Sequence, residues 1–88
     1  MKPNLYVIAL ALTMPAGAFA MPALGDVIGT DPETATTALK EAGCEVREFE
    51  VEDGLIEAKC VETETSTLWE IYIDPADGTV ARIKSEDD

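Results

Sequence analysis

The fold of this chain is decided by residues 69–84, Trp-Glu-Ile-Tyr-Ile-Asp-Pro-Ala-Asp-Gly-Thr-Val-Ala-Arg-Ile-Lys. Apolar and polar side chains alternate in the first part of this stretch, which is typical of a half-buried β-strand. The following Asp-Pro-Ala-Asp-Gly favours a chain reversal, after which a second strand is expected. We therefore predict an antiparallel hairpin in which Trp69 lies opposite Ile83 and Ile71 lies opposite Ala81.

A second hairpin is predicted upstream, over residues 46–52 and 55–62. The two segments flank Asp53-Gly54, a dipeptide typical of a type I′ turn. The apolar alternation slips at Arg47, and a β-bulge there would return the preceding valine to the buried face. The predicted pairs are Phe49 with Ala58, Val51 with Ile56, Val46 with Cys60, and Cys44 with Glu62.

A helix is predicted before the two hairpins. Asp31 is a suitable N-cap, Pro32 suits the first helical position, and Gly43 suits the residue after the helix. A narrow apolar stripe, made mostly of alanine, would let the helix approach a sheet closely while adding little to the core. The stripe consists of Ala35, Ala38, Leu39 and Ala42.

These elements predict an α+β fold, with one N-terminal helix packed on a four-stranded antiparallel sheet of two consecutive hairpins. The domain is expected over residues 31–84, after a leader at 21–30 and before an acidic, frayed tail at 85–88. The predicted core consists of Leu39, Val46, Phe49, Val51, Ile56, Ala58, Trp69, Ile71, Ile73 and Ile83.

Residues 1–20 have the pattern of a secretory signal peptide. Lys2 supplies the positive charge, residues 5–12 form an apolar run, and Ala-Phe-Ala at 18–20 is a small-x-small cleavage site. The apolar run is shorter than the roughly 20 residues of a spanning helix, which disfavours a membrane anchor. We expect cleavage after Ala20, or alternatively after Ala18, and a periplasmic or secreted protein.

The chain is strongly acidic, with a formal net charge of −12, and removal of a signal peptide containing Lys2 and no acid would make it −13. Such a charge excludes a nucleic-acid-binding protein and disfavours anionic membrane surfaces. We expect that the acidic residues keep the protein soluble and monomeric. The alternative is an acidic patch that attracts a basic partner.

The chain contains two cysteines, Cys44 and Cys60. In a small exported domain a disulfide between them would contribute on the order of 3 kcal/mol in the chain-entropy model. Diagonal neighbours in a sheet have Cα atoms roughly 7–8 Å apart, beyond the usual disulfide range of about 4.4–6.8 Å. We therefore expect that Cys44 bends inward where the chain leaves Gly43.

Histidine is absent from the sequence, so the commonest general base and metal ligand are missing. We predict a protein that is not an enzyme and has no cofactor and no metal site. Asp74 and Asp77 raise the alternative of calcium binding, but turn formation explains both residues better. Tyr72 is predicted to project from the outer face of the sheet, and the candidate interaction surface consists of Tyr72, Glu70, Asp74 and Asp77.

Residues 69–80 also resemble the C-terminal hairpin of PepSY domains, small extracytoplasmic modules named for their occurrence in peptidase propeptides. The likeness extends as an apolar pattern from Asp31 through Gly43 and the hairpin at 49–56. It implies a helix packed on an antiparallel sheet, an extracytoplasmic location, and a role in restraining or modulating peptidases. The cysteine pair is not part of the general family pattern.

A single PepSY-like unit without an attached peptidase implies that any peptidase would be met in trans. The leading hypothesis is thus an exported, non-enzymatic binding module that modulates or inhibits a peptidase through its sheet face or an edge strand. The alternative is an acidic envelope stress or accessory protein that binds cations or a basic partner.

Overall fold

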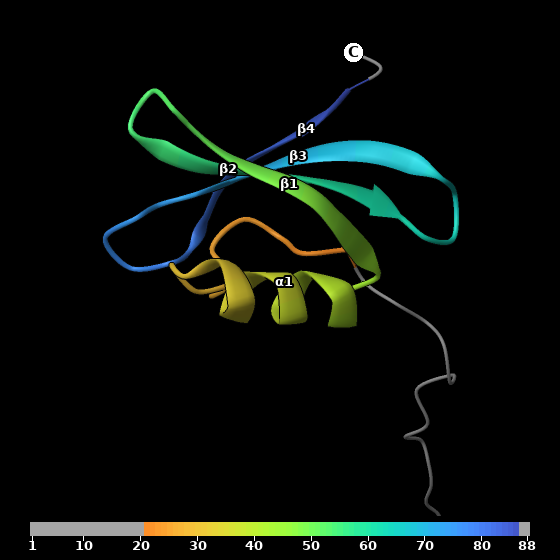
Figure 1. Ribbon diagram of the computed structural model, residues 1–88, viewed down its shortest axis with the longest axis horizontal. Helices are drawn as coiled ribbons and strands as arrows, with labels where there is room; N and C mark the ends of the chain where they lie inside the picture. The colour runs from red at the N-terminus through yellow and green to blue at the C-terminus, as the bar shows by residue number, and fades with distance from the viewer. Residues whose placement is uncertain (1–20, 87–88) are drawn as a thin grey trace, which may run out of the picture.

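The computed structural model describes residues 21–86, which form one helix and a four-stranded antiparallel sheet. The strands lie side by side in the order in which they occur along the chain. The helix covers one face of the curved sheet (Figure 1). The predicted α+β architecture is thus confirmed, with elements α1 (Pro32–Glu41), β1 (Cys44–Glu52), β2 (Leu55–Glu62), β3 (Thr67–Ile73) and β4 (Val80–Ser85).

Helix α1 begins and ends as predicted. The Asp31 side chain accepts hydrogen bonds from the backbone N–H groups of Glu33 and Thr34, at 2.9 and 3.1 Å. The Thr34 hydroxyl donates to the same carboxylate at 2.6 Å, and these bonds lower the pKa of Asp31. After the helix, Gly43 has a φ of 90°, a conformation that glycine adopts readily. The cap fixes where the helix starts relative to the sheet.

The hairpin of β1 and β2 has the predicted register throughout. Asp53 and Gly54 both have positive φ values, 55° and 79°, as a type I′ turn requires. Phe49 pairs with Ala58 and Val51 with Ile56. The predicted bulge also occurs, between Val46 and Glu48, and it places Val46 opposite Cys60. The bulge keeps the apolar side chains on both sides of it on the face that α1 covers.

The register predicted for β3 and β4 was wrong by two residues. Ile71 lies opposite Ile83, and Trp69 lies opposite Ser85. The connection is longer than a tight turn, because the Asp74 N–H donates to the Thr79 carbonyl at 2.8 Å. A second bulge then leaves Ala81 as an extra residue in β4, since Tyr72 pairs with Arg82 and Ile73 with Val80. A shift of two residues preserves the face, so Ile83 still points inward as predicted.

Most of the predicted core is found between α1 and the sheet. Leu39, Ala58, Ile71 and Ile73 are fully buried. The prediction that Val51 belongs to the core was wrong, because 80% of its surface is exposed. It lies near the free end of an edge strand, where a cavity rather than helix α1 faces it. The predicted core residues that are partly buried are Val46, Phe49, Ile56, Trp69 and Ile83. The core cluster also contains five buried residues that were not predicted in the core, Ile28, Ala35, Cys44, Cys60 and Val80.

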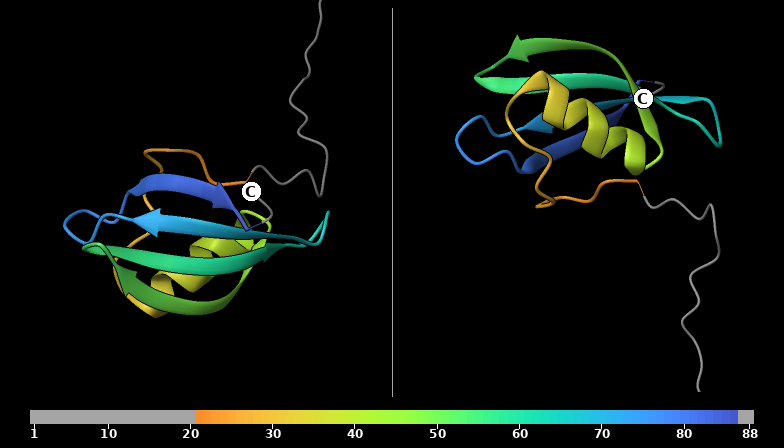
Figure 2. Two further views of the ribbon diagram at one scale, coloured as in Figure 1. Left: turned by 90° about the horizontal axis from the view of Figure 1, so that it is seen from above. Right: turned by 60° about the horizontal axis from the view of Figure 1, so that its bottom comes forward.

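Residues 21–30, predicted as a leader, pack against the start of β4. Ile28 is 5% exposed, and its N–H donates to the Gly78 carbonyl at 2.7 Å. The Val80 N–H donates to the Asp26 carbonyl at 2.9 Å, so the segment forms a short antiparallel contact beside β4. A Cβ atom on Gly78 would lie 2.9 Å from the Cα atom of Gly29, so this approach requires glycine. Figure 2 shows the segment beside β4.

The predicted signal peptide, residues 1–20, lies outside the described residues, as does the end of the predicted acidic tail. Within residues 21–86, no helix is long and apolar enough to cross a membrane.

Candidate functional site

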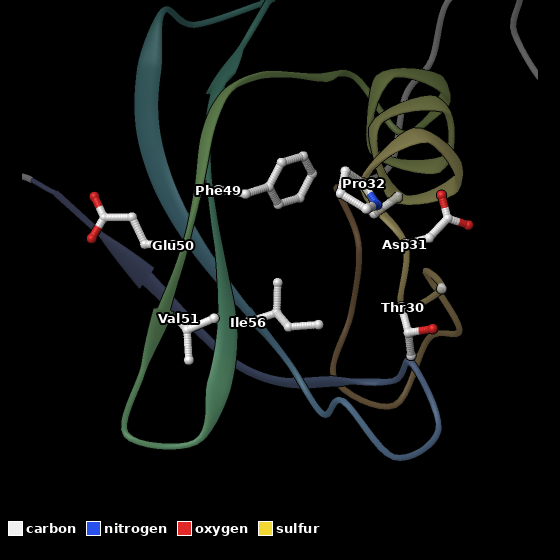
Figure 3. A pocket seen from close by; sticks show the side chains of 9 residues that line it. Thr30, Asp31, Pro32, Phe49, Glu50, Val51 and Ile56 are labelled. Atoms are coloured by element: carbon white, nitrogen blue, oxygen red, sulfur yellow. The ribbon is translucent and has the colours of Figure 1, made fainter.

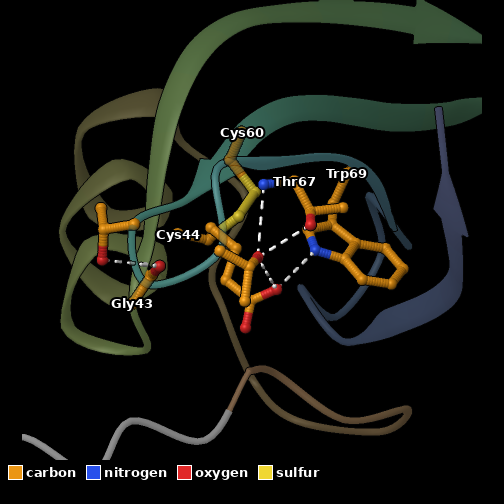
Figure 4. Close-up of a disulfide and its surroundings, with 8 residues drawn as sticks. Gly43, Cys44, Cys60, Thr67 and Trp69 are labelled. Carbon is orange, nitrogen blue, oxygen red and sulfur yellow. Dashed lines mark hydrogen bonds between the residues drawn. A yellow bond between two sulfur atoms is a disulfide. The ribbon is translucent and has the colours of Figure 1, made fainter. Parts of the chain in front are cut away.

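The two ends of the layer between α1 and the sheet differ. One end is closed by the predicted disulfide between Cys44 and Cys60, whose Cα atoms are 5.4 Å apart (Figure 4). Both cysteines are fully buried beside Leu39 in the core cluster. Their Cα separation is shorter than the roughly 7–8 Å of flat diagonal neighbours, as the inward bend expected at Cys44 requires. The backbone N–H of Thr63 donates to the Gly43 carbonyl at 2.9 Å next to this point.

Hydrogen bonds surround the disulfide. The Trp69 indole N–H donates to the Glu62 carboxylate at 3.0 Å, and the Thr65 hydroxyl donates to the same oxygen at 3.0 Å. This carboxylate therefore joins β2, the β2–β3 connection and β3. The closed end is consequently a structural region, with its polar groups already used within the fold.

The opposite end of the layer contains a groove, defined here as the cavity between the start of α1 and the β1–β2 hairpin. Its volume is about 370 Å³. Figure 3 shows the Phe49 and Ile56 side chains pointing into the groove, whereas Glu50 points away from it. The residues that line the groove are Gly29, Thr30, Asp31, Pro32 and Ala35 on one side, and Phe49, Glu50, Val51 and Ile56 on the other.

The groove exists because the start of α1 offers only small side chains to the sheet. Ala35 is the helix residue that faces Phe49 and Ile56 there, and Pro32 precedes it by one turn. The side chains of Phe49, Val51 and Ile56 were predicted in the core, and the groove was not predicted. The signal was present, since a stripe composed mostly of alanine cannot fill the space above a phenylalanine and an isoleucine.

The prediction that Tyr72 is an exposed aromatic side chain was wrong, because only 3% of its surface is accessible. It does lie on the outer face, where its hydroxyl donates to Glu70 at 2.9 Å. The Arg82 guanidinium carbon lies 4.1 Å from the centre of the ring and covers it. The hydrogen bond to Glu70 and burial raise the pKa of Tyr72 to about 12. Tyr72 is therefore not available as a contact residue.

Glu57 lies next to Tyr72 and is 2% exposed. Burial raises the pKa of this carboxyl group to about 7, and a hydrogen bond with Glu52 adds to the effect. The Tyr72 hydroxyl lies 3.5 Å from Glu57 and 3.4 Å from Glu52. Glu57 can exchange a proton near neutral pH, but its burial keeps it from touching a substrate.

A shared lysine neutralises part of the outer face. Lys59 on β2 forms ion pairs with Glu48 and Glu50 on β1, at 3.4 and 3.3 Å. Hydrogen bonding with Glu48 and Lys59 lowers the pKa of Glu50, and the two glutamates raise the pKa of Lys59. One lysine thus forms ion pairs with two carboxylates, so this side of β1 keeps a net negative charge.

Asp74 and Asp77 lie in the β3–β4 connection and are not among the residues that line the groove. The Asp74 carboxylate accepts the Ala76 N–H at 2.8 Å, and the Asp77 carboxylate accepts both the N–H and the hydroxyl of Thr79, at 3.0 and 2.7 Å. These bonds to Thr79 lower the pKa of Asp77. Apart from the burial of Tyr72, the interaction surface predicted from the sequence stays a prediction. Among residues 21–86, no group of three or more acidic or cysteine side chains is arranged to hold a metal ion.

The comparisons with known proteins yield one result. The family model described as peptidase propeptide and YPEB domain matches residues 4–84, which is most of the chain. No curated protein matches the chain significantly. No solved structure does so either.

Proposed function

The chain belongs to the family of peptidase propeptide and YPEB domains, and on this basis we propose that it is a binding module that modulates a peptidase supplied as a separate chain. The family match carries this proposal. The structure adds a stable framework, a disulfide-linked sheet, that presents an open groove beside an edge strand. Its role is to bind rather than to catalyse, because the perturbed carboxyl group of Glu57 is buried out of reach of a substrate.

The proposed place of action is the periplasm or the cell exterior. The charged, apolar and small-residue pattern of residues 1–20 supports export. The buried Cys44–Cys60 disulfide agrees with an oxidising compartment, where such bonds form and persist. Mass spectrometry of the protein recovered outside the cytoplasm should find a chain that starts at Met21, and a full-length chain there would contradict cleavage.

The proposed function is tested by adding the purified protein to peptidases from the same compartment. Hydrolysis of a protein substrate should slow with a saturable dependence on the concentration of the added protein. Mass spectrometry of the added protein should find it intact, which separates an inhibitor from a competing substrate. An unrelated acidic protein of matched size and charge is the control.

Unchanged proteolysis across these peptidases would contradict the proposal. An equal effect of the acidic control protein would also contradict it, because charge alone would then account for the result.

A further inference from the structure

Strand β1 is the uncovered edge of the sheet. Its inner neighbour is β2, and within residues 21–86 no segment lies along its outer side (Figure 2). The other edge strand, β4, is partly covered, because residues 25–28 hydrogen-bond to residues 78–80. An open edge strand offers unpaired backbone N–H and C=O groups to another chain.

The open backbone groups of β1 belong to Phe49 and Val51. In a hairpin with a two-residue turn, the residues that flank the turn, here Glu52 and Leu55, form a hydrogen-bonded pair. Hydrogen-bonded and non-hydrogen-bonded pairs alternate along an antiparallel ladder, so Val51 and Phe49 belong to the second kind. Their N–H and C=O groups consequently point away from β2.

The side chains of the same two residues line the groove. In a sheet, residues directly opposite each other project from the same face, and successive residues project from opposite faces. A strand added beside β1 would therefore place every second side chain next to Phe49 and Val51, at the groove. Because the groove is lined mainly by apolar groups, those positions should be apolar.

The remaining side chains of an added strand would lie on the outer face, next to Glu48, Glu50 and Glu52. Lys59 forms ion pairs with Glu48 and Glu50, but its single positive charge faces three carboxylates of β1 on this side of the sheet. Basic side chains at those positions would complete the charge balance. A second copy of this chain is unsuitable, since pairing β1 with β1 would place glutamates against glutamates.

We infer that the edge of β1 takes an extended segment of a partner protein as a fifth strand, and that this segment alternates apolar and basic side chains. Its apolar side chains occupy the groove over Phe49 and Val51, and its basic side chains lie beside the β1 glutamates. The inference rests on the proposed binding function, but it does not depend on the partner being a peptidase.

The test uses the purified protein and a short capped peptide that alternates valine and lysine, with binding followed by NMR. Backbone amide shifts should concentrate at Phe49 and Val51 and in the residues lining the groove. A peptide that alternates valine and glutamate should bind at least about tenfold more weakly, because like charges would then face each other. Equal binding of the two peptides would overturn the choice of a basic partner.

Backbone pairing is tested by N-methylation, which removes peptide N–H donors without changing side chains. Methylating one alternate set of residues should weaken binding at least about tenfold, and methylating the other set should change it less than about twofold. The set of residues whose methylation weakens binding shows whether the added strand runs antiparallel or parallel to β1. Equal effects of the two sets would overturn strand addition.

A pair of protein variants locates the edge. Val51→Pro removes an outward N–H from β1, where an edge strand tolerates proline, and should weaken binding of the valine–lysine peptide at least about fivefold. Val27→Pro is the control, because Val27 is similarly exposed, 73% against 80%, but lies beside β4. Equal losses in both variants would overturn the assignment to β1, and the N-methylated peptides keep the test valid if Val51→Pro unfolds.

The outcomes separate this inference from the proposed function. Inhibition of a peptidase without binding of the valine–lysine peptide would keep the proposed function and overturn the strand addition. Alternation-dependent binding of the peptide at β1, with no effect on any peptidase, would keep the strand addition and contradict the proposed peptidase.

Discussion

The disulfide end and the groove end of this small domain differ in how completely their side chains are packed. At the first, Cys44, Cys60 and Leu39 are fully buried and the surrounding polar groups are paired. At the second, Phe49 and Ile56 face a cavity and Val51 is 80% exposed. The difference indicates that one covalent bond and a compact half support a second half that is left open, and this open half is where we propose that the partner binds.

The largest effect should come from removing the disulfide. The double variant Cys44→Ala/Cys60→Ala should lower the free energy of unfolding by about 2–5 kcal/mol, because a loop closed across 16 residues is released and buried sulfur atoms are lost. Urea denaturation of the variant and the parent measures the change. A loss below about 1 kcal/mol would mean that the disulfide end does not support the groove end.

The next effect concerns Glu57, on the outer face behind the groove. Its folded-state pKa of about 7 lies above the ordinary value of 4.5, so the folded protein binds more protons than the unfolded chain between these pH values. Its contribution to stability is therefore greatest below pH 4.5, falls as the pH rises to about 7, and is constant above that.

Glu57→Gln should remove this part of the pH dependence and raise the free energy of unfolding at pH 8 by about 1–2 kcal/mol. Denaturation curves of both proteins between pH 4 and 8 measure it. Because other carboxyl groups, among them Glu50 and Glu70, have lowered pKa values, the difference between the two proteins is the informative quantity. If the free energies of unfolding of the two proteins changed equally with pH, the raised pKa of Glu57 would be contradicted.

A smaller effect is expected at the start of α1, which forms one wall of the groove. Asp31→Ala removes the N-cap and should cost about 1 kcal/mol, whereas Asp31→Asn should retain most of the stability. Thermal denaturation measures both variants. Equal losses for alanine and asparagine would indicate that charge rather than capping stabilises this end.

The smallest effect should be at the groove itself. Val51→Ala should change the free energy of unfolding by less than about 0.5 kcal/mol, since the side chain is exposed. Val80→Ala is the matched control at a position that is 3% exposed, and it should cost about 2 kcal/mol. Similar losses at the two valines would mean that the groove is part of the core.

Local sequence signals predicted much of this fold. The Asp31 cap, the Asp53-Gly54 turn and the bulge before Glu48 each depend on neighbouring residues, and each occurs as expected. The register of β3 and β4 was predicted wrongly because it depends on a bulge at Ala81. The three-residue spacing between the inward-pointing Val80 and Ile83 was a signal of that bulge, but the prediction did not use it.

The candidate site was less predictable, because it depends on what covers each face. Tyr72 was expected to be exposed because the alternation of the strand places it on the outer face. Alternation predicts the face of the sheet correctly, but it does not predict that Arg82 packs over the Tyr72 ring. Val51 has the alternation of a core residue, and only the short reach of an alanine-rich helix exposes it. Contacts between distant segments, such as Ile28 with Gly78, carry no local signal at all.

The contact between residues 25–28 and 78–80 ties the beginning of the described chain to its last strand. A nascent polypeptide that has not yet reached Gly78 therefore has no partner for the Ile28 amide and no cover for its side chain. Native structure of such high contact order cannot be completed segment by segment during synthesis. The domain can complete its fold only after the C-terminal hairpin has left the ribosome. Until then the preceding polypeptide lacks its full tertiary structure and can still pass through a narrow channel.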